Sequence, residues 1–224
     1  MQTANNNKFN GWSLFEISWL LISTIVMIGL SIVWKDSLIS LVSGVTGIIG
    51  VVLCAKGKIH TYYFSIINVF LYALLCLQNK LYGEVMLNLL YFIPMNIIGF
   101  YLWKKQKNDD GTVKARSLTV KGYIIMVVGL VVSISLYYQL LKGLGGNLQL
   151  VDSITTMTSV VAIILQVLRY KEQWTLWIII NIASVIMWTM LLNTPNGSIT
   201  MIIMWAAYLI NSIYGYFNWK KLDS

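Results

Sequence analysis

Three side chains with binding chemistry stand at helical spacing in the segment WTLWIIIN. Trp174, Trp177 and Asn181 occupy positions i, i+3 and i+7, so a helix would place all three on one face. Indole rings can stack on a flat heteroaromatic ring, and they attract one that carries positive charge. An amide can bond to a carboxamide or to sugar hydroxyls. This face predicts a binding site for a small, planar, polar solute that is neutral or cationic.

Further amides and tyrosines lie deep within apolar segments. An unpartnered amide in hydrocarbon costs about 2–7 kcal/mol, so these groups must meet one another, water or a ligand. They can instead hold neighbouring helices together, and a shallow tryptophan such as Trp174 can belong to an interfacial belt. Both alternatives stay open for any single residue. The other candidates for the site are Asn68, Asn88, Tyr91, Asn96, Gln166, Tyr208 and Asn211.

The elements that must position these residues are membrane-spanning helices. Apolar residues make up 58% of the 224 positions and charged residues only 11%, whereas a soluble domain carries about 25% charged residues. The charges cluster between apolar runs long enough to cross a bilayer as helix. The composition predicts an all-α integral membrane protein with eight transmembrane helices, at about 14–34, 37–55, 59–78, 82–103, 121–141, 152–169, 173–193 and 199–219.

The basic residues divide unequally between the two sides of the membrane that these spans define. Thirteen of the 16 lysines and arginines fall on the side that also holds both termini and the long central loop; the other three are Lys35, Lys80 and Lys142. The positive-inside rule therefore places both termini in the cytoplasm. This distribution explains the positive net charge without nucleic-acid binding.

The chemistry of an enzyme is missing from the sequence. The single histidine, His60, lies beside lysines at a helix end, and Cys54 and Cys76 fall inside spans, so we expect no catalytic set, metal or cofactor. The acidic residues Glu84 and Asp152 lie near the external ends of their spans. The lack of deeper ionisable groups favours uncoupled movement of a solute, although proton coupling and sodium binding by backbone carbonyls stay open.

An internal repeat suggests how the spans are organised. Asp36-Ser37 and Gly99-Phe-Tyr-Leu-Trp-Lys-Lys105 recur 116 residues later as Asp152-Ser153 and Gly215-Tyr-Phe-Asn-Trp-Lys-Lys221. Aligning Asn68 with Asn181, 113 residues apart, sets the two tryptophans against Thr61 and Phe64. Trp-Lys-Lys could also be a simple membrane-edge anchor. We expect one N-terminal helix plus a 3+1+3 core of parallel repeats, divided into residues 1–35, 36–105, 106–145 and 146–224.

Two long blocks carry a family resemblance: AKGKIHTYYFSIINVFLYALLCLQNKLYGEVMLNLLYFIPMNIIGFYLWKK and QWTLWIIINIASVIMWTML. Together with GWSLFE before the first span, they are similar to the Pnu family of vitamin transporters, and within it to the nicotinamide riboside carriers. The W-x-x-W-x-x-x-N element, which that family uses around its substrate, corresponds to Trp174, Trp177 and Asn181.

The resemblance implies a bacterial inner-membrane protein with a SWEET-like fold that forms a homotrimer. It also implies facilitated diffusion (uniport) of unphosphorylated nicotinamide riboside, with net uptake maintained by a cytoplasmic kinase that phosphorylates the solute. Members of the family carry thiamine or riboflavin, so thiamine or another vitamin remains an alternative substrate. A proton-coupled carrier is the alternative mechanism.

Overall fold

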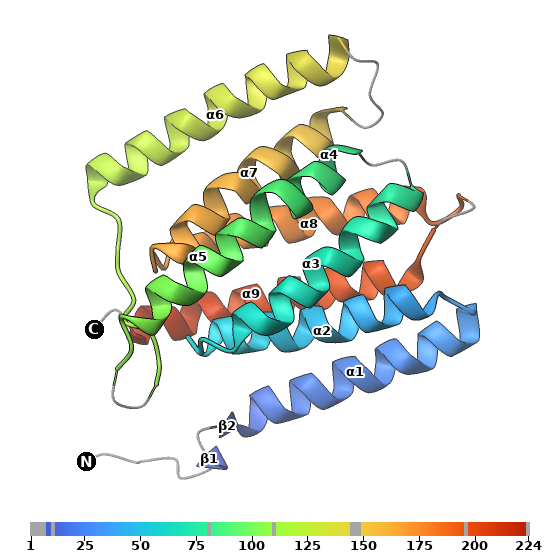
Figure 1. The fold of residues 1–224 in the computed structure, drawn as a ribbon, viewed down its shortest axis with the longest axis horizontal. Helices are drawn as coiled ribbons and strands as arrows, with labels where there is room; N and C mark the ends of the chain where they lie inside the picture. The colour runs from blue at the N-terminus through green and yellow to red at the C-terminus, as the bar shows by residue number, and fades with distance from the viewer. Residues whose placement is uncertain are drawn as a thin grey trace.

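The computed structural model describes residues 8–9, 12–79, 82–108, 111–143, 149–194 and 197–222. Apart from a short hairpin at the N-terminus, the regular elements in these residues are helices (Figure 1). In chain order they are β1 (Lys8–Phe9), β2 (Trp12–Ser13), α1 (Leu14–Trp34), α2 (Leu38–Ala55), α3 (Thr61–Gln78), α4 (Tyr82–Met86), the π-helical η1 (Leu87–Phe92), α5 (Ile93–Lys104), α6 (Val120–Gly143), α7 (Gln149–Val167), α8 (Gln173–Leu191) and α9 (Ile199–Leu222).

The eight predicted transmembrane helices are confirmed. In the described residues, eight helical segments are long and apolar enough to cross a bilayer, and their ends lie close to the predicted ones. The fourth span runs through α4, η1 and α5 as one continuous rod. Its π-helical turn ends just before Pro94. Because proline has no N–H to donate, a local change of helical winding at this point is expected.

Helix α7, the sixth span, begins earlier than the sequence suggested. Asp36 and Ser37 precede α2, where the Ser37 Oγ accepts a hydrogen bond from the Ser40 N–H at 3.0 Å. Asp152 and Ser153 instead lie inside α7, which already begins at Gln149. The recurring Asp-Ser pair therefore marks the start of α2 but not the start of α7, because identical letters stand at different positions relative to the helix start.

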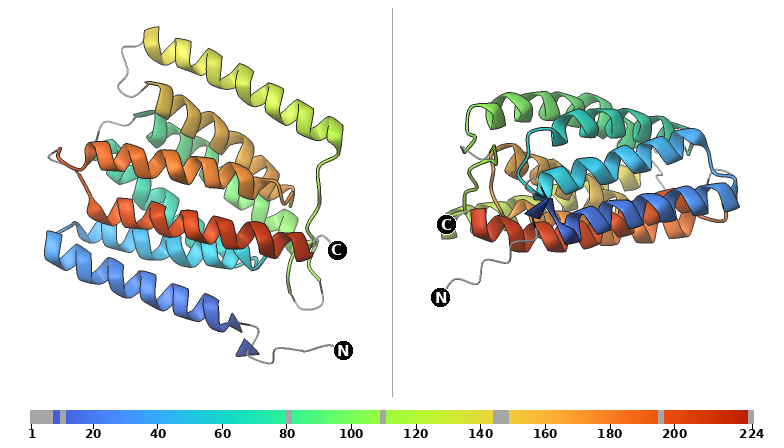
Figure 2. Two further views of the ribbon diagram at one scale, coloured as in Figure 1. Left: turned by 180° about the vertical axis from the view of Figure 1, so that it is seen from behind. Right: turned by 90° about the horizontal axis from the view of Figure 1, so that it is seen from below.

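Six helices form a closed ring. α2 packs on α3, α3 on α5, α5 on α7, α7 on α8, α8 on α9, and α9 again on α2. α1 packs outside the ring on α2 and α9, and α6 packs on α7, so these two helices lie at opposite edges (Figures 1 and 2). None of the described residues of α6 is buried in the monomer. Its apolar surface suits contact with lipid.

The long central loop ties together one end of the ring. The Val113 N–H donates to the Gly57 carbonyl at 2.9 Å, between α2 and α3. The Arg116 N–H donates to the Arg169 carbonyl at 2.8 Å, between α7 and α8. Figure 1 shows the start of α1 and the end of α9 at this same end. Most of the loops that carry lysine or arginine lie at this end, which we call the basic end. Lys80, which the sequence assigned to the opposite side, lies outside the described residues.

Candidate binding cavity

The ring of six helices encloses a cavity with an empty volume of about 970 Å³, including space open to the outside. Two packed clusters bound it. One contains Tyr72 and Trp188, whose indole N–H donates to the Tyr72 hydroxyl at 3.1 Å. The other, at the basic end, contains Tyr62, Trp103 and Trp219. Ligand sites in helical proteins commonly lie between helices, where apolar walls carry a few polar groups, and this cavity has both.

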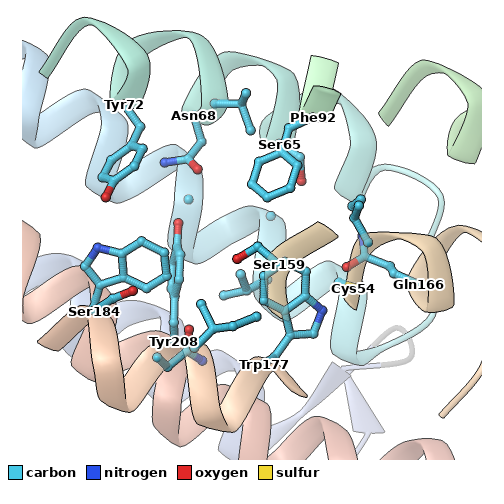
Figure 3. Close-up of a pocket in the computed structure, with 18 of the residues that line it drawn as sticks. Cys54, Ser65, Asn68, Tyr72, Phe92, Ser159, Gln166, Trp177, Ser184 and Tyr208 are labelled. Carbon is cyan, nitrogen blue, oxygen red and sulfur yellow. The ribbon is translucent and has the colours of Figure 1, made fainter. Parts of the chain in front are cut away.

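Two tryptophans of α8 form an aromatic wall toward the basic end. Trp174 is only 2% exposed, which excludes contact with lipid headgroups, and its ring meets Trp219 at a centroid distance of 6.0 Å. Its Nε1–H has no hydrogen-bond partner among the described atoms. Trp177 is half-buried and lines the cavity beside Gln166 and Ser159 (Figure 3). The wall offers flat π-faces and one free N–H donor.

Unpartnered acceptor atoms accompany this wall. The Asn181 amide N–H donates to the Ser212 hydroxyl at 2.8 Å, and the Asn96 amide N–H donates to the Phe92 carbonyl at 2.9 Å. In both residues the buried Oδ1 has no partner among the described atoms. Buried polar groups are nearly always bonded, so unpartnered atoms beside a cavity indicate where a ligand or a water molecule is expected.

Three more predicted residues line the cavity. The Asn68 amide N–H donates to the Ser43 carbonyl at 2.8 Å, and the Tyr208 ring points toward Asn68 from the opposite side (Figure 3). Gln166 lines the basic end, where its backbone carbonyl accepts from the Trp103 Nε1–H at 3.1 Å. Asn88 donates its amide N–H to the Glu84 carbonyl at 2.7 Å. The structure thus brings together Asn68, Asn88, Asn96, Gln166, Trp174, Trp177, Asn181 and Tyr208.

Two predicted residues are not among those that line the cavity. The Tyr91 hydroxyl donates to the Val160 carbonyl at 2.9 Å and so joins η1 to α7. The Asn211 amide donates to the Val51 carbonyl at 2.8 Å and so joins α9 to α2. Both side chains hold neighbouring helices together, which is the alternative that the sequence had left open.

Several lining residues were missed from the sequence. Five residues that carry a hydroxyl line the cavity: Thr61, Ser65, Ser159, Ser184 and Ser212. Ser65, Asn68 and Tyr72 stand at i, i+3 and i+7, so the periodicity that singled out α8 could have found them. Glu84 was also missed. It was placed near the end of its span, yet it is only 8% exposed and lines the cavity.

The turns that lead into α3 and α8 have matching backbones. Gly57 and Arg169 have φ angles of 68° and 67°, and each residue that follows bonds back to the preceding helix: Lys58 N–H to Leu53 O at 2.9 Å, and Tyr170 N–H to Leu165 O at 2.8 Å. Corresponding positions in these two turns are 112 residues apart. The offset of 113 that aligned Asn68 with Asn181 is therefore wrong by one residue.

The corrected offset places Tyr62, and not Thr61, against Trp174. Tyr62 meets Trp103 edge-on at 5.1 Å, as Trp174 meets Trp219 at 6.0 Å. A Cβ on Gly99 would lie 2.5 Å from the Tyr62 ring, as one on Gly215 would lie 2.7 Å from the Trp174 ring. The lining positions of α3 then pair with those of α8 as Ser65 with Trp177, Asn68 with Ile180, Val69 with Asn181, and Tyr72 with Ser184.

A polar and aromatic cavity enclosed by membrane-spanning helices is typical of a solute transporter. The sequence profile of the nicotinamide mononucleotide transporter family matches residues 37–221, and the chain belongs to this family. It is therefore a multi-pass membrane transporter and not an enzyme.

Known members of the family are similar over most of the chain. The nicotinamide riboside transporter PnuC of Neisseria mucosa is 40% identical over 220 residues, which are 96% of this chain and 84% of that protein. The PnuC of Haemophilus influenzae is 39% identical over 95% of this chain and 92% of its own length. The crystal structure of a vitamin B3 transporter PnuC matches with a TM-score of 0.86 at 41% identity, covering 96% of this chain and 94% of that one.

Proposed function

We propose that this protein carries nicotinamide riboside across the bacterial inner membrane by facilitated diffusion. The observation that carries the proposal is the pairing of the Trp174–Trp177 wall with the unpartnered Oδ1 atoms of Asn96 and Asn181. The indoles can stack on a pyridinium ring. The two Oδ1 atoms can accept from a carboxamide and a ribose hydroxyl. Relatives that are 39% and 40% identical carry the name of nicotinamide riboside transporters, which supports the choice of substrate.

The absence of basic side chains from the cavity lining favours the riboside over its phosphorylated form, although the name of the family contains the mononucleotide. None of the described residues that line the cavity is a lysine, an arginine or a histidine. A phosphate group that enters such a cavity loses its hydration without gaining a cationic partner. The riboside, which lacks that phosphate, avoids this cost.

Binding to the purified protein tests the substrate. Calorimetric titrations should compare nicotinamide riboside, nicotinamide mononucleotide, thiamine and riboflavin under one condition. We expect measurable affinity for nicotinamide riboside and affinity lower by at least about tenfold for the other three, equivalent to about 1.4 kcal/mol. Thiamine binding without nicotinamide riboside binding would move the protein to the thiamine alternative and leave the fold unchanged.

We further propose uniport, with net uptake maintained by a cytoplasmic kinase that phosphorylates the imported riboside. The same cavity favours one competing mechanism, because Glu84 is a buried carboxylate in its wall and could carry a proton. Proteoliposomes with the membrane potential clamped by a potassium ionophore separate the two. Uniport gives uptake that does not change when a pH gradient is imposed; proton coupling makes uptake rise or fall with that gradient.

For the architecture we propose a SWEET-like 3+1+3 core of parallel repeats, with residues 36–105 and 146–224 as the repeats, residues 106–145 as the connector and residues 1–35 preceding them. The matching turns at Gly57 and Arg169 support it. The charge asymmetry supports cytoplasmic termini, and the resemblance to Pnu proteins supports a homotrimer. Native mass spectrometry tests the trimer. Labelling of single cysteines added at either terminus, in intact cells and in inverted vesicles, tests the orientation.

A further inference from the structure

We infer that Glu84 selects for positive charge in the transported solute: its carboxylate draws cationic solutes, such as pyridinium ribosides, into the end of the cavity opposite the aromatic wall. This inference rests on the proposed function and adds a specificity residue to it. The aromatic wall and the amides recognise the shape and the hydrogen-bonding groups of the solute. Glu84 reads its charge.

The burial of Glu84 carries the inference. It lies in the first turn of α4, is 8% exposed, and lines the cavity together with Asn88 one turn further on. The Asn88 amide N–H bonds to the backbone carbonyl of Glu84. Every other described residue that lines the cavity is neutral. In the part of the chain that the structure describes, the ion pair between Lys56 and Glu16 belongs to the opposite, basic end.

A second carboxylate strengthens the negative potential at this end. Asp152 stands on α7, which packs against α4, and its Oδ1 accepts from the Thr156 hydroxyl at 3.0 Å. Two acidic groups on contacting helices make this the acidic end of the cavity; Lys35 and Lys142 lie at the same end of the ring but do not line the cavity. A low-dielectric wall focuses such a field into the cavity and raises the local concentration of cations.

The two ends of the cavity therefore perform different tasks. Glu84 and Asn96 lie 12 positions apart on one span, which is about 18 Å of helix at 1.5 Å per residue. A carboxylate in a low-dielectric wall attracts a cationic solute over this distance, by about 0.9 kcal/mol at an effective dielectric constant of about 20. A neutral solute of the same shape gains nothing from the carboxylate. The selectivity for charge thus belongs to the acidic end, and stacking belongs to the aromatic end.

A pair of ligands that differ in charge isolates this effect. Nicotinamide riboside carries a positive pyridinium ring, and its 1,4-dihydro form has nearly the same size and no charge. Both are titrated by calorimetry against the wild type and Glu84→Gln, which keeps the side-chain volume and removes the charge. We expect the Kd of nicotinamide riboside to rise about fivefold, about 0.9 kcal/mol for a charge about 18 Å away, and the Kd of the dihydro form to change by less than about twofold. Equal changes for both ligands, or no change for either, would overturn the inference.

Two further variants complete the experiment. Glu172→Gln removes a buried carboxylate at the basic end that bonds to the Tyr123 hydroxyl and does not line the cavity, so the ratio of the two Kd values should stay at the wild-type value. A shifted ratio there would also overturn the inference. If Glu84→Gln does not fold, Asp152→Asn takes its place, with an expected threefold shift of the ratio. A wild type that binds neither ligand refutes the proposed function and this inference together; one that binds normally while the ratio is unchanged in the variants refutes only the inference.

Discussion

Helices α3 and α8 enter the ring through turns of the same backbone geometry, yet they present different side chains to the cavity. Where α8 has Trp174, Trp177 and Asn181, the corresponding positions of α3 hold Tyr62, Ser65 and Val69. The turns and the contacts beneath Gly99 and Gly215 are alike because both helices must pack into the same kind of ring. The cavity faces differ as the proposed binding of an asymmetric solute requires, with a stacking surface on one side and smaller side chains on the other.

The largest difference in substrate affinity between the two helices should appear when a ring of the aromatic wall is removed. Trp177→Ala should weaken the binding of nicotinamide riboside roughly 30-fold, about 2 kcal/mol, because stacking on an aromatic side chain is worth about 1–3 kcal/mol per ring. The matched variant at the corresponding α3 position, Ser65→Ala, should change the affinity by less than about twofold. Calorimetric titration measures both, and similar losses would mean that the two faces contribute equally.

The two close-packed glycines separate packing from binding. Gly99→Ala and Gly215→Ala should each lower stability by about 1–3 kcal/mol, since the new methyl group overlaps a ring. Only Gly215→Ala should also weaken substrate binding, by about tenfold, because Trp174 lines the cavity and Tyr62 is not among its lining residues. Thermal unfolding in detergent gives the first quantity and titration the second. Unchanged affinity in Gly215→Ala would show that the position of Trp174 does not matter for the substrate.

Asn181 and Val69 form the next pair. Asn181→Ala removes the unpartnered Oδ1 and the bond to Ser212, so we expect about tenfold weaker binding, about 1.4 kcal/mol. Val69→Ala at the corresponding position removes only apolar contacts and should leave the affinity within about twofold. The same titrations measure both variants. A larger loss of affinity in Val69→Ala than in Asn181→Ala would mean that α3, and not α8, carries the residues that bind the solute.

Asp36 lies outside both helices and serves as the control with the smallest effect. Burial alone would raise the pKa of its carboxyl, but hydrogen bonds from Ser198, Thr200 and the Ser37 N–H outweigh this and lower the pKa. Asp36→Asn should cost about 1 kcal/mol of stability at neutral pH and leave substrate binding unchanged.

The pH dependence of that control follows from the sign of the shift. A lowered folded-state pKa means that the carboxylate stabilises the protein above the unfolded value, about 3.9, and that this stabilisation is lost as the pH falls through the folded pKa. The difference in unfolding temperature between the wild type and Asp36→Asn should therefore shrink below about pH 4. A difference that is constant with pH would assign the effect to packing.

The sequence patterns correctly predicted the features that depend only on neighbouring residues. The eight spans followed from the cost of placing backbone and charge in hydrocarbon, which the order of residues already encodes. The face of Trp174, Trp177 and Asn181 followed from helical periodicity. Tyr91 and Asn211 have the same chemistry as the residues that line the cavity, but the rotation of their helices turns them toward carbonyls on neighbouring helices. Rotation about a helix axis is set by packing, which a single span does not reveal.

The alignment of the two halves failed for a related reason. Asp36-Ser37 matches Asp152-Ser153 in letters at an offset of 116, whereas the turns before α3 and α8 correspond at 112; the offset returns to 116 for Trp103 and Trp219. The connection between α8 and α9 is thus four residues longer than its counterpart. Connections vary in length without disturbing the packed helices, so spatial equivalence follows the turns and contacts.

The sequence by itself determined the class of the protein, its eight helices and one face of its cavity, because membrane insertion and helical periodicity act on neighbouring residues. Only the tertiary structure decided which polar groups meet in the cavity, which of them hold helices together, and that Glu84 belongs to its wall. Those outcomes depend on contacts between segments far apart in the chain. A carboxylate near the end of a span becomes part of the cavity wall only when five other helices close around it.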